Sequence, residues 1–163
     1  MIKIGIISDT HIHDSLQVLP EKALQDFKTA DLVIHSGDLV DLSVLGQLRS
    51  VCKNVVAVWG NMDPAEIKNE LAEKEIIKAG KHRIGVIHGF GHPSKLIKFV
   101  KERFKDDCVD VIIFGHSHVP FNEKIGKIIY FNPGSLTDKM FAPYNSYGII
   151  EINDEIKAKI VKI

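Results

Sequence analysis

Seven side chains that can bind a metal ion follow five apolar segments of this chain. They are two aspartates, one asparagine and four histidines: Asp9, His11, Asp38, Asn61, His88, His116 and His118. The apolar segments have the pattern of buried strands and cover residues 4–7, 32–34, 55–58, 84–87 and 111–114. Ligand sites in α/β folds lie just beyond the carboxyl ends of parallel strands. We therefore expect the side chains to meet at one edge of a sheet, where they are numerous enough to hold two metal ions.

The donor types indicate which metals such a site prefers. Carboxylate and imidazole together suit Mn, Fe, Co, Ni or Zn, whereas Ca and Mg favour shells made of oxygen alone. Asp9 and His11 are two residues apart just past a strand, and an extended chain would point both side chains to the same side. Gly37 lets the backbone turn sharply before Asp38, whose carboxylate can bridge two ions with one oxygen on each.

The segment Gly115-His116-Ser117-His118 is the most specific of the five motifs. Two histidines at positions i and i+2 after an apolar strand can each serve a different ion. The alternative interpretation is a pair of exposed loop histidines. Because the other four candidate segments are also present in order along the chain, we favour the metal site.

The spacing of apolar residues predicts the elements that position these side chains. In the first half of the chain, strands over residues 2–7, 31–35 and 54–59 alternate with helices over 20–28 and 42–49. Pro20 suits the first turn of a helix. This alternation is typical of βαβ units and a parallel sheet.

The second half of the chain predicts antiparallel pairs, with a hairpin turn at Gly80-Lys81. Strands are expected over residues 75–79, 82–87, 109–114, 121–125, 127–131, 146–152 and 155–163, and an amphipathic helix over 94–104. One twisted sheet rarely exceeds about ten strands without splitting. We therefore predict one domain over residues 1–163 with an α/β fold of the α+β type: a four-layer αββα sandwich of two mixed β-sheets flanked by helices.

Composition argues against several classes of partner. Lys+Arg and Asp+Glu are both 21, so the net charge of 0 attracts neither nucleic acid nor an anionic membrane. No apolar run approaches the roughly 18 residues of a membrane span. Cys52 and Cys108 lack C-x-x-C spacing, and we predict buried free thiols rather than a disulfide. With no signal-peptide pattern at the N-terminus, we expect a cytoplasmic protein.

The five motifs together resemble the calcineurin-like metallophosphoesterase superfamily, whose pattern is D-x-H, G-D, G-N, H and G-H-x-H. The short length, the turn Asn132-Pro133-Gly134-Ser135 and the C-terminal hairpin resemble its small bacterial and archaeal phosphodiesterase branch (YfcE/Vps29-like). The resemblance covers essentially the whole chain. It implies the same four-layer sandwich and a metal-dependent phosphoesterase, more specifically a phosphodiesterase with a dinuclear metal site.

The resemblance also implies a role for each candidate ligand. Carried over residue by residue, the family pattern places Asp9, His11 and His118 on one ion. It places Asn61, His88 and His116 on the second ion, with Asp38 bridging both. Two ions, Mn²⁺ or Ni²⁺ with Fe, Co or Zn as alternatives, would clamp a phosphate and generate a bridging hydroxide that attacks phosphorus. Asp38, Asn61 and His88 would thus act in catalysis through the metals.

Position 62 departs from the family pattern. Many relatives have a histidine there, proposed to protonate the leaving group, whereas Met62 cannot donate a proton. This favours phosphodiesters with activated leaving groups. Asp63 has two interpretations: the partner of such a histidine in relatives that have one, or a cap for the helix that Pro64 begins, which we favour.

Indications about the substrate are weaker. His92 lies four residues beyond His88 in the same glycine-rich loop, and His13 follows the D-x-H turn. We list both with Asn61 as candidate substrate-binding residues, and a solvent-exposed loop histidine is the alternative for each. The segment 137–144 either reaches over the site or forms a dimer contact, so a homodimer or higher homo-oligomer stays open.

Three other functions are compatible with the same fold. A non-catalytic scaffold like the retromer subunit Vps29 is the first alternative, but all four histidines of the ligand set are present. A phosphomonoesterase or protein phosphatase is the second, and Met62 and the short loops argue against it. A nuclease is the third, and the neutral charge balance argues against nucleic acid as partner. We expect a small phosphodiester as the substrate.

Overall fold

The computed structural model describes residues 1–163 and contains ten strands, four α-helices and one 3-10 helix. The strands are β1 (Ile2–Ile7), β2 (Leu32–His35), β3 (Val55–Ala57), β4 (Lys74–Ala79), β5 (His82–Ile87), β6 (Val111–Ile113), β7 (Phe121–Ile125), β8 (Ile128–Asn132), β9 (Ser146–Ile152) and β10 (Ile156–Lys162). The helices are α1 (Glu21–Phe27), α2 (Ser43–Val51), α3 (Ala65–Glu70), η1 (Pro93–Lys95) and α4 (Leu96–Arg103). No helix combines the length and the apolar character that crossing a membrane requires.

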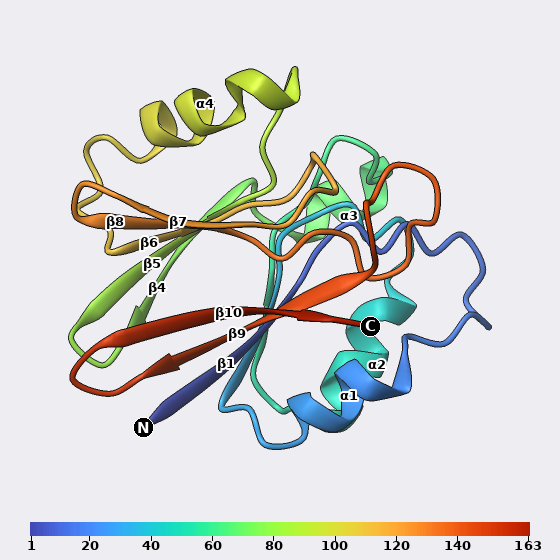
Figure 1. Ribbon diagram of the computed structural model, residues 1–163. Coiled ribbons are helices and arrows are strands. Elements are labelled where there is room, and N and C mark those ends of the chain that lie inside the picture. The colour runs from blue at the N-terminus through green and yellow to red at the C-terminus, as the bar shows by residue number, and fades with distance from the viewer.

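The strands form two five-stranded sheets, in the orders β10-β9-β1-β2-β3 and β4-β5-β6-β8-β7. Each sheet is mixed, because β1 pairs parallel with β2 and antiparallel with β9, while β6 pairs parallel with both β5 and β8 and β7 pairs antiparallel with β8. The sheets face each other, with α1 and α2 outside one sheet and α4 outside the other (Figure 1). The predicted αββα sandwich of two mixed sheets is confirmed.

Three hydrophobic cores correspond to the three interfaces between these layers. Ile4, Ile6 and Phe131 belong to the core between the two sheets. A second core contains Phe27 of α1 and lies between the helices and the first sheet, and a third contains Val100 of α4. Alternate residues of β1 face opposite sides of its sheet, so β1 contributes to two cores, which explains why residues 4–7 read as one apolar run.

The cysteines are both free, as predicted, but they differ in exposure. Cys52 is buried at the end of α2, whereas Cys108 is exposed in the loop before β6. The expectation that both thiols are buried is therefore wrong for Cys108. Its neighbour Val109 packs inward, while Cys108 itself has a φ of 48° and its side chain is exposed.

Candidate metal centre

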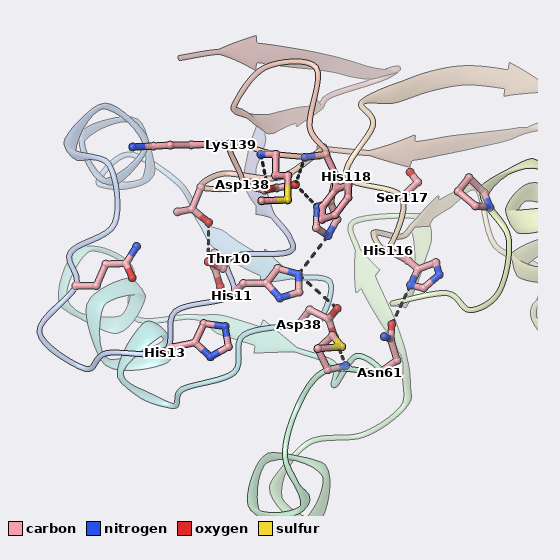
Figure 2. A pocket seen from close by; sticks show the side chains of 16 residues that line it. Thr10, His11, His13, Asp38, Asn61, His116, Ser117, His118, Asp138 and Lys139 are labelled. Carbon is pink, nitrogen blue, oxygen red and sulfur yellow. Dashed lines mark hydrogen bonds and ion pairs between the residues drawn. The ribbon is translucent and has the colours of Figure 1, made fainter.

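The seven candidate ligands follow five strands that belong to two sheets, not to one. The first sheet contributes the residues after β1, β2 and β3, and the second contributes those after β5 and β6. The expectation of a single sheet edge is therefore wrong, because the site lies where the carboxyl ends of strands from both sheets meet. Figure 2 shows side chains from both sets of loops around one cavity.

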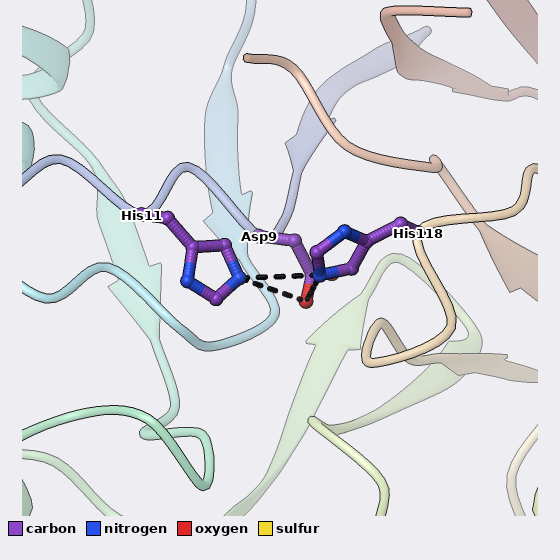
Figure 3. A group of neighbouring side chains, drawn as sticks. All are labelled: Asp9, His11 and His118. Carbon is purple, nitrogen blue, oxygen red and sulfur yellow. Dashed lines mark hydrogen bonds and ion pairs between the residues drawn. The ribbon is translucent and has the colours of Figure 1, made fainter. Parts of the chain in front are cut away.

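Asp9, His11 and His118 point toward one another (Figure 3). Nε2 of His118 lies 3.2 Å from Nε2 of His11 and 3.2 Å from Oδ1 of Asp9. Nε2 of His11 lies 3.8 Å from the same Asp9 oxygen. Segments 107 residues apart in the sequence thus direct three metal-binding atoms at one point.

Asp9, Asp38 and His88 form a second group that shares Asp9 with the first. Nε2 of His88 lies 3.2 Å from Oδ2 of Asp38 and 3.8 Å from Oδ1 of Asp9. Oδ2 of Asp38 also lies 3.6 Å from Nε2 of His11, so this one oxygen faces both groups. The other Asp38 oxygen accepts a hydrogen bond from the backbone N–H of Met62 at 2.7 Å, so Asp38 does not turn one oxygen toward each group.

Asn61 and His116 complete the cluster. Oδ1 of Asn61 lies 2.8 Å from Nδ1 of His116, and the His116 ring lies 5.4 Å from the ring of His88, nearly perpendicular to it. Both residues stand at the edge of the cavity in Figure 2. The structure thus brings all seven candidates together, while the role of each as a ligand stays a prediction.

Three histidines are held so that one nitrogen of each faces the centre. The other ring nitrogen of each lies beside an acceptor oxygen: His88 beside the Ser36 carbonyl (2.8 Å), His116 beside the Gly91 carbonyl (2.8 Å) and His118 beside the Asp138 carboxylate (2.5 Å). A ring nitrogen can only donate to such an oxygen, so its N–H is used there. The remaining nitrogen faces inward and can bind a metal once it is unprotonated, which is how histidines that bind metal are usually oriented.

Two polar atoms at the centre of this cluster lack hydrogen-bond partners. Oδ1 of Asp9 and Nε2 of His88 are buried and have no hydrogen-bond partner within the chain. Burying such groups unpaired costs free energy, so most buried polar atoms in folded proteins are satisfied. A divalent cation bound among these atoms would satisfy both of them. The donor set therefore fits a metal ion of the kind that prefers mixed nitrogen and oxygen ligands.

The carboxylates and the histidines of the cluster shift one another's pKa values. Burial on its own would raise the pKa of Asp9, but His88, His11 and His118 lower it well below the usual range, so the carboxylate is ionised. Burial on its own would lower the pKa of His88, but Asp9 and Asp38 raise it to about 9. His118 behaves in the same way, because Asp9 and Asp138 outweigh its burial and raise its pKa to about 9.

These pKa values predict that metal binding depends on pH. A histidine must lose its proton to coordinate a metal, and at pH 7 both His88 and His118 carry one in the metal-free protein. The apparent affinity for Ni²⁺ should therefore rise between pH 6.5 and 9, about tenfold per pH unit for each proton displaced. Competition with a chelator at several pH values measures this slope. An affinity that stays constant over that interval would contradict the assigned protonation.

The backbone at the site adopts an unusual conformation. Five of the seven candidates have positive φ angles: Asp9 (52°), His11 (42°), Asp38 (57°), His116 (70°) and His118 (58°). Non-glycine residues rarely occupy this region, and such conformations cluster at functional sites. The expectation that the chain stays extended between Asp9 and His11 is therefore wrong. A left-handed backbone at both residues, not strand alternation, directs their side chains to the centre.

Asp63 has a structural role that the sequence interpretation missed. Its carboxylate accepts backbone N–H groups from Asp38 (3.0 Å), Val40 (2.7 Å) and Gly60 (2.7 Å). The N-terminus of α3 has no side-chain cap, so the interpretation of Asp63 as a helix cap is wrong. Asp63 instead ties the turn that carries Asp38 to the turn before Asn61. Only glycine fits at position 60, because a Cβ there would collide with the Asp38 carboxylate.

Asp138 is a second residue that sequence analysis did not single out. Besides contacting His118, its carboxylate accepts the backbone N–H groups of Met140 (2.8 Å), Phe141 (3.0 Å) and Ala142 (3.0 Å). The segment 137–144 therefore reaches over the site, which was one of its two expected roles. No pattern of residue types around Asp138 signals these contacts, because hydrogen bonds to backbone N–H groups do not depend on the side chains of the donors.

Replacing Asp138 with asparagine should weaken metal binding by about 10- to 100-fold, because the carboxylate that orients His118 loses its charge. Metal affinity of the purified variant, measured by chelator competition, tests this. Asp154→Asn, in the exposed turn between β9 and β10, is the matched control and should bind metal like the wild type. An unchanged affinity in the Asp138 variant would show that the contact does not orient the ring for binding.

A cavity of about 870 Å³ opens over the centre (Figure 2). His13 is exposed and lines it, as do the exposed side chains of Met62 and Phe141. His92 is not among the lining residues, and its Nδ1 instead accepts the backbone N–H of Ser94 (3.3 Å) at the start of η1. Of the two extra histidines proposed to contact substrate, the structure places His13 at the cavity and His92 beside the neighbouring turn.

Comparison with known proteins agrees with this geometry. Residues 2–155 match the model of the calcineurin-like phosphoesterase superfamily domain. The chain belongs to this superfamily. The family predicted from the sequence motifs is confirmed, and relatives named metallophosphoesterase and phosphodiesterase support the predicted hydrolase class.

Named relatives of this calcineurin-like phosphoesterase align with most of its length. It is 39% identical to the probable metallophosphoesterase MJ0623 of Methanocaldococcus jannaschii, over 98% of this chain and 81% of that protein. It is 30% identical to phosphodiesterase MJ0936 of the same organism, over 82% of this chain and 83% of that protein. Among solved structures, a single-substitution mutant of Vps29 from Entamoeba histolytica matches with a TM-score of 0.77 and 25% identity, over 99% of each chain.

Proposed function

We propose that this calcineurin-like phosphoesterase is a phosphodiesterase that uses two divalent metal ions. The observation that carries the proposal is the position of Asp38, whose Oδ2 lies 3.6 Å from Nε2 of His11 and 3.2 Å from Nε2 of His88. One ion would be held by Asp9, His11 and His118, and the other by Asn61, His88 and His116, with Asp38 contacting both. Mn²⁺ and Ni²⁺ are the proposed ions, and Fe, Co and Zn also suit this donor set.

The seven ligands set the charge of the loaded centre. Only Asp9 and Asp38 carry negative charge, because Asn61 and unprotonated histidines are neutral. Two divalent ions would leave the centre with a net positive charge, which attracts the anionic phosphate of a diester. Such ions lower the pKa of a water molecule and neutralise charge on phosphate oxygens. Burial of Asp9 and Asp38 keeps competing water away from the ligand atoms.

Two features favour diesters over monoesters as substrates. Met62 lines the cavity at the position where many relatives have a histidine, so the chain offers no proton donor there for a poor leaving group. The centre also opens into a broad cavity in which both substituents of a diester have room. The relative named phosphodiesterase MJ0936, at 30% identity, supports the same choice.

Introducing a histidine by Met62→His should raise activity on poorly activated diesters only slightly. A well-positioned general acid contributes about 100-fold or more, but it needs a partner that orients it. Asp63 cannot serve, because it is buried and accepts three backbone N–H groups. We expect less than about a tenfold gain in kcat/KM on an alkyl diester relative to Met62→Gln. A gain of 100-fold would show that another group orients the new ring.

Hydrolysis by metal-stripped protein, with Mn²⁺ or Ni²⁺ titrated back, tests the proposed function. A chromogenic diester and the matching monoester are compared at each metal concentration. We expect no turnover without metal, and metal-dependent cleavage of the diester in preference to the monoester. Cleavage of neither, with metal shown to be bound, would contradict the proposal and favour a scaffold function like that of Vps29.

A further inference from the structure

A second cavity of about 450 Å³ lies on the other side of the candidate ligands His88 and Asn61. Asn61 lines both this cavity and the larger one, so the two cavities adjoin the same edge of the centre. A phosphodiester has two substituents on one phosphorus atom. A phosphate bound at the centre could therefore extend one substituent into each cavity.

The walls of the second cavity are aromatic. Trp59, Phe90 and Phe99 line it, and Phe90 is 65% exposed. The Phe90 ring also stacks on His116, with the two planes 26° apart and the centroids separated by 6.5 Å. Aromatic walls next to a phosphate site suit a planar aromatic ligand, since stacked ring pairs are more favourable than their buried area alone predicts.

Positive charge lies beside these rings. Nζ of Lys68 is 5.4 Å from the Trp59 ring centroid and donates a hydrogen bond to the Asn61 carbonyl at 3.2 Å. Arg103 also lines the cavity but forms a 2.9 Å ion pair with Glu73. Lys68 therefore supplies the net positive charge of the second cavity, close to the turn that carries Asn61. This charge suits a substituent that is attached to an anionic phosphate.

We propose that the second cavity, between Trp59, Phe90 and Phe99, binds the aromatic ring of one ester substituent of the substrate. The inference rests on the proposed phosphodiesterase function and names the substrate class: diesters that carry an aryl group or a nucleobase. The cavity volume lies within the range of about 300–1,000 Å³ found for small-molecule sites. An aliphatic substituent would use the apolar walls but not their stacking geometry.

Trp59 makes this inference testable without turnover, because it is the only tryptophan of the chain. Phenyl phosphate, adenosine 5′-monophosphate, methyl phosphate and inorganic phosphate are titrated separately into the metal-loaded protein. Trp59 fluorescence and calorimetric affinity are both recorded. We expect one or both aromatic probes to quench Trp59 and to bind about tenfold more tightly than methyl phosphate. The stronger of the two identifies the ring as a simple aryl group or a nucleobase.

Phe90→Ser removes one aromatic side chain of the second cavity, and Ile125→Ser is the control, since Ile125 is an exposed apolar residue that lines neither cavity. The Phe90 variant should lose most of the preference for the aromatic probe and keep its affinity for methyl phosphate, while the control keeps both affinities. Equal binding of all probes without quenching would overturn the inference and leave the phosphodiesterase proposal intact. No binding of any phosphate to the loaded protein would overturn both.

Discussion

Replacing Asp38 with alanine is expected to reduce kcat/KM for a phosphodiester by about a thousandfold or more. The reason is its position: one carboxylate oxygen faces His11 in one group and His88 in the other. Without it, neither candidate metal position keeps its full ligand set, and the buried negative charge that balances the ions is halved. Steady-state hydrolysis at saturating Mn²⁺ measures the loss, and metal analysis of the same sample shows how many ions remain.

The variant Asp38→Asn removes the negative charge of the side chain but keeps its size and one acceptor oxygen. The amide keeps an oxygen that can accept the Met62 N–H, so this variant should fold like the wild type and still lose most of its activity. Near-normal turnover in the alanine variant would refute the assignment of Asp38 to both ions. Normal metal content with turnover lost would instead place its role in the reaction and not in binding.

Removing the Asp63 carboxylate by Asp63→Ala should lower the free energy of unfolding by about 3 kcal/mol, even in the metal-free protein. Three backbone N–H groups, those of Asp38, Val40 and Gly60, would lose their acceptor in a region where water has little access. Because these groups fix the turns before two candidate ligands, metal affinity should fall as well. Urea denaturation of metal-stripped protein measures the first effect and chelator competition the second.

Asp106→Ala is the matched control for this variant, because Asp106 is exposed in the loop after α4. Its stability should stay within about 0.5 kcal/mol of the wild type. If Asp63→Ala also stayed within that margin, the three hydrogen bonds would not be what holds the two turns together. A stable variant with weakened metal binding would still leave Asp63 a positioning role.

Much of the fold follows from local sequence signals. The strands expected over residues 2–7, 82–87, 121–125 and 146–152 match β1, β5, β7 and β9 residue for residue. Two of them end directly before a turn residue, β7 before Gly126 and β9 before Asn153. The expected strand over 109–114 is shorter in the structure (Val111–Ile113), because the chain leaves the sheet early to form the loop that carries His116.

The identity of the candidate ligands could also be predicted, but not how they are held. Their residue types and order are visible along the chain, whereas the positive φ of Asp9 and His118 depends on loops that meet only after folding. Asp63 binds backbone groups up to 25 residues away, and Asp138 contacts a histidine 20 residues away. Hydrogen bonds to backbone N–H groups leave no trace in residue types, so these two carboxylates were missed or misinterpreted.

Anomalous diffraction from crystals grown with Mn²⁺ tests the central claim most directly. The account predicts two manganese peaks in each chain: one among Asp9, His11 and His118, and one among Asn61, His88 and His116. Oδ2 of Asp38 should contact both. A single peak, or two peaks that do not share Asp38, would contradict the dinuclear centre on which the proposed phosphodiesterase function depends.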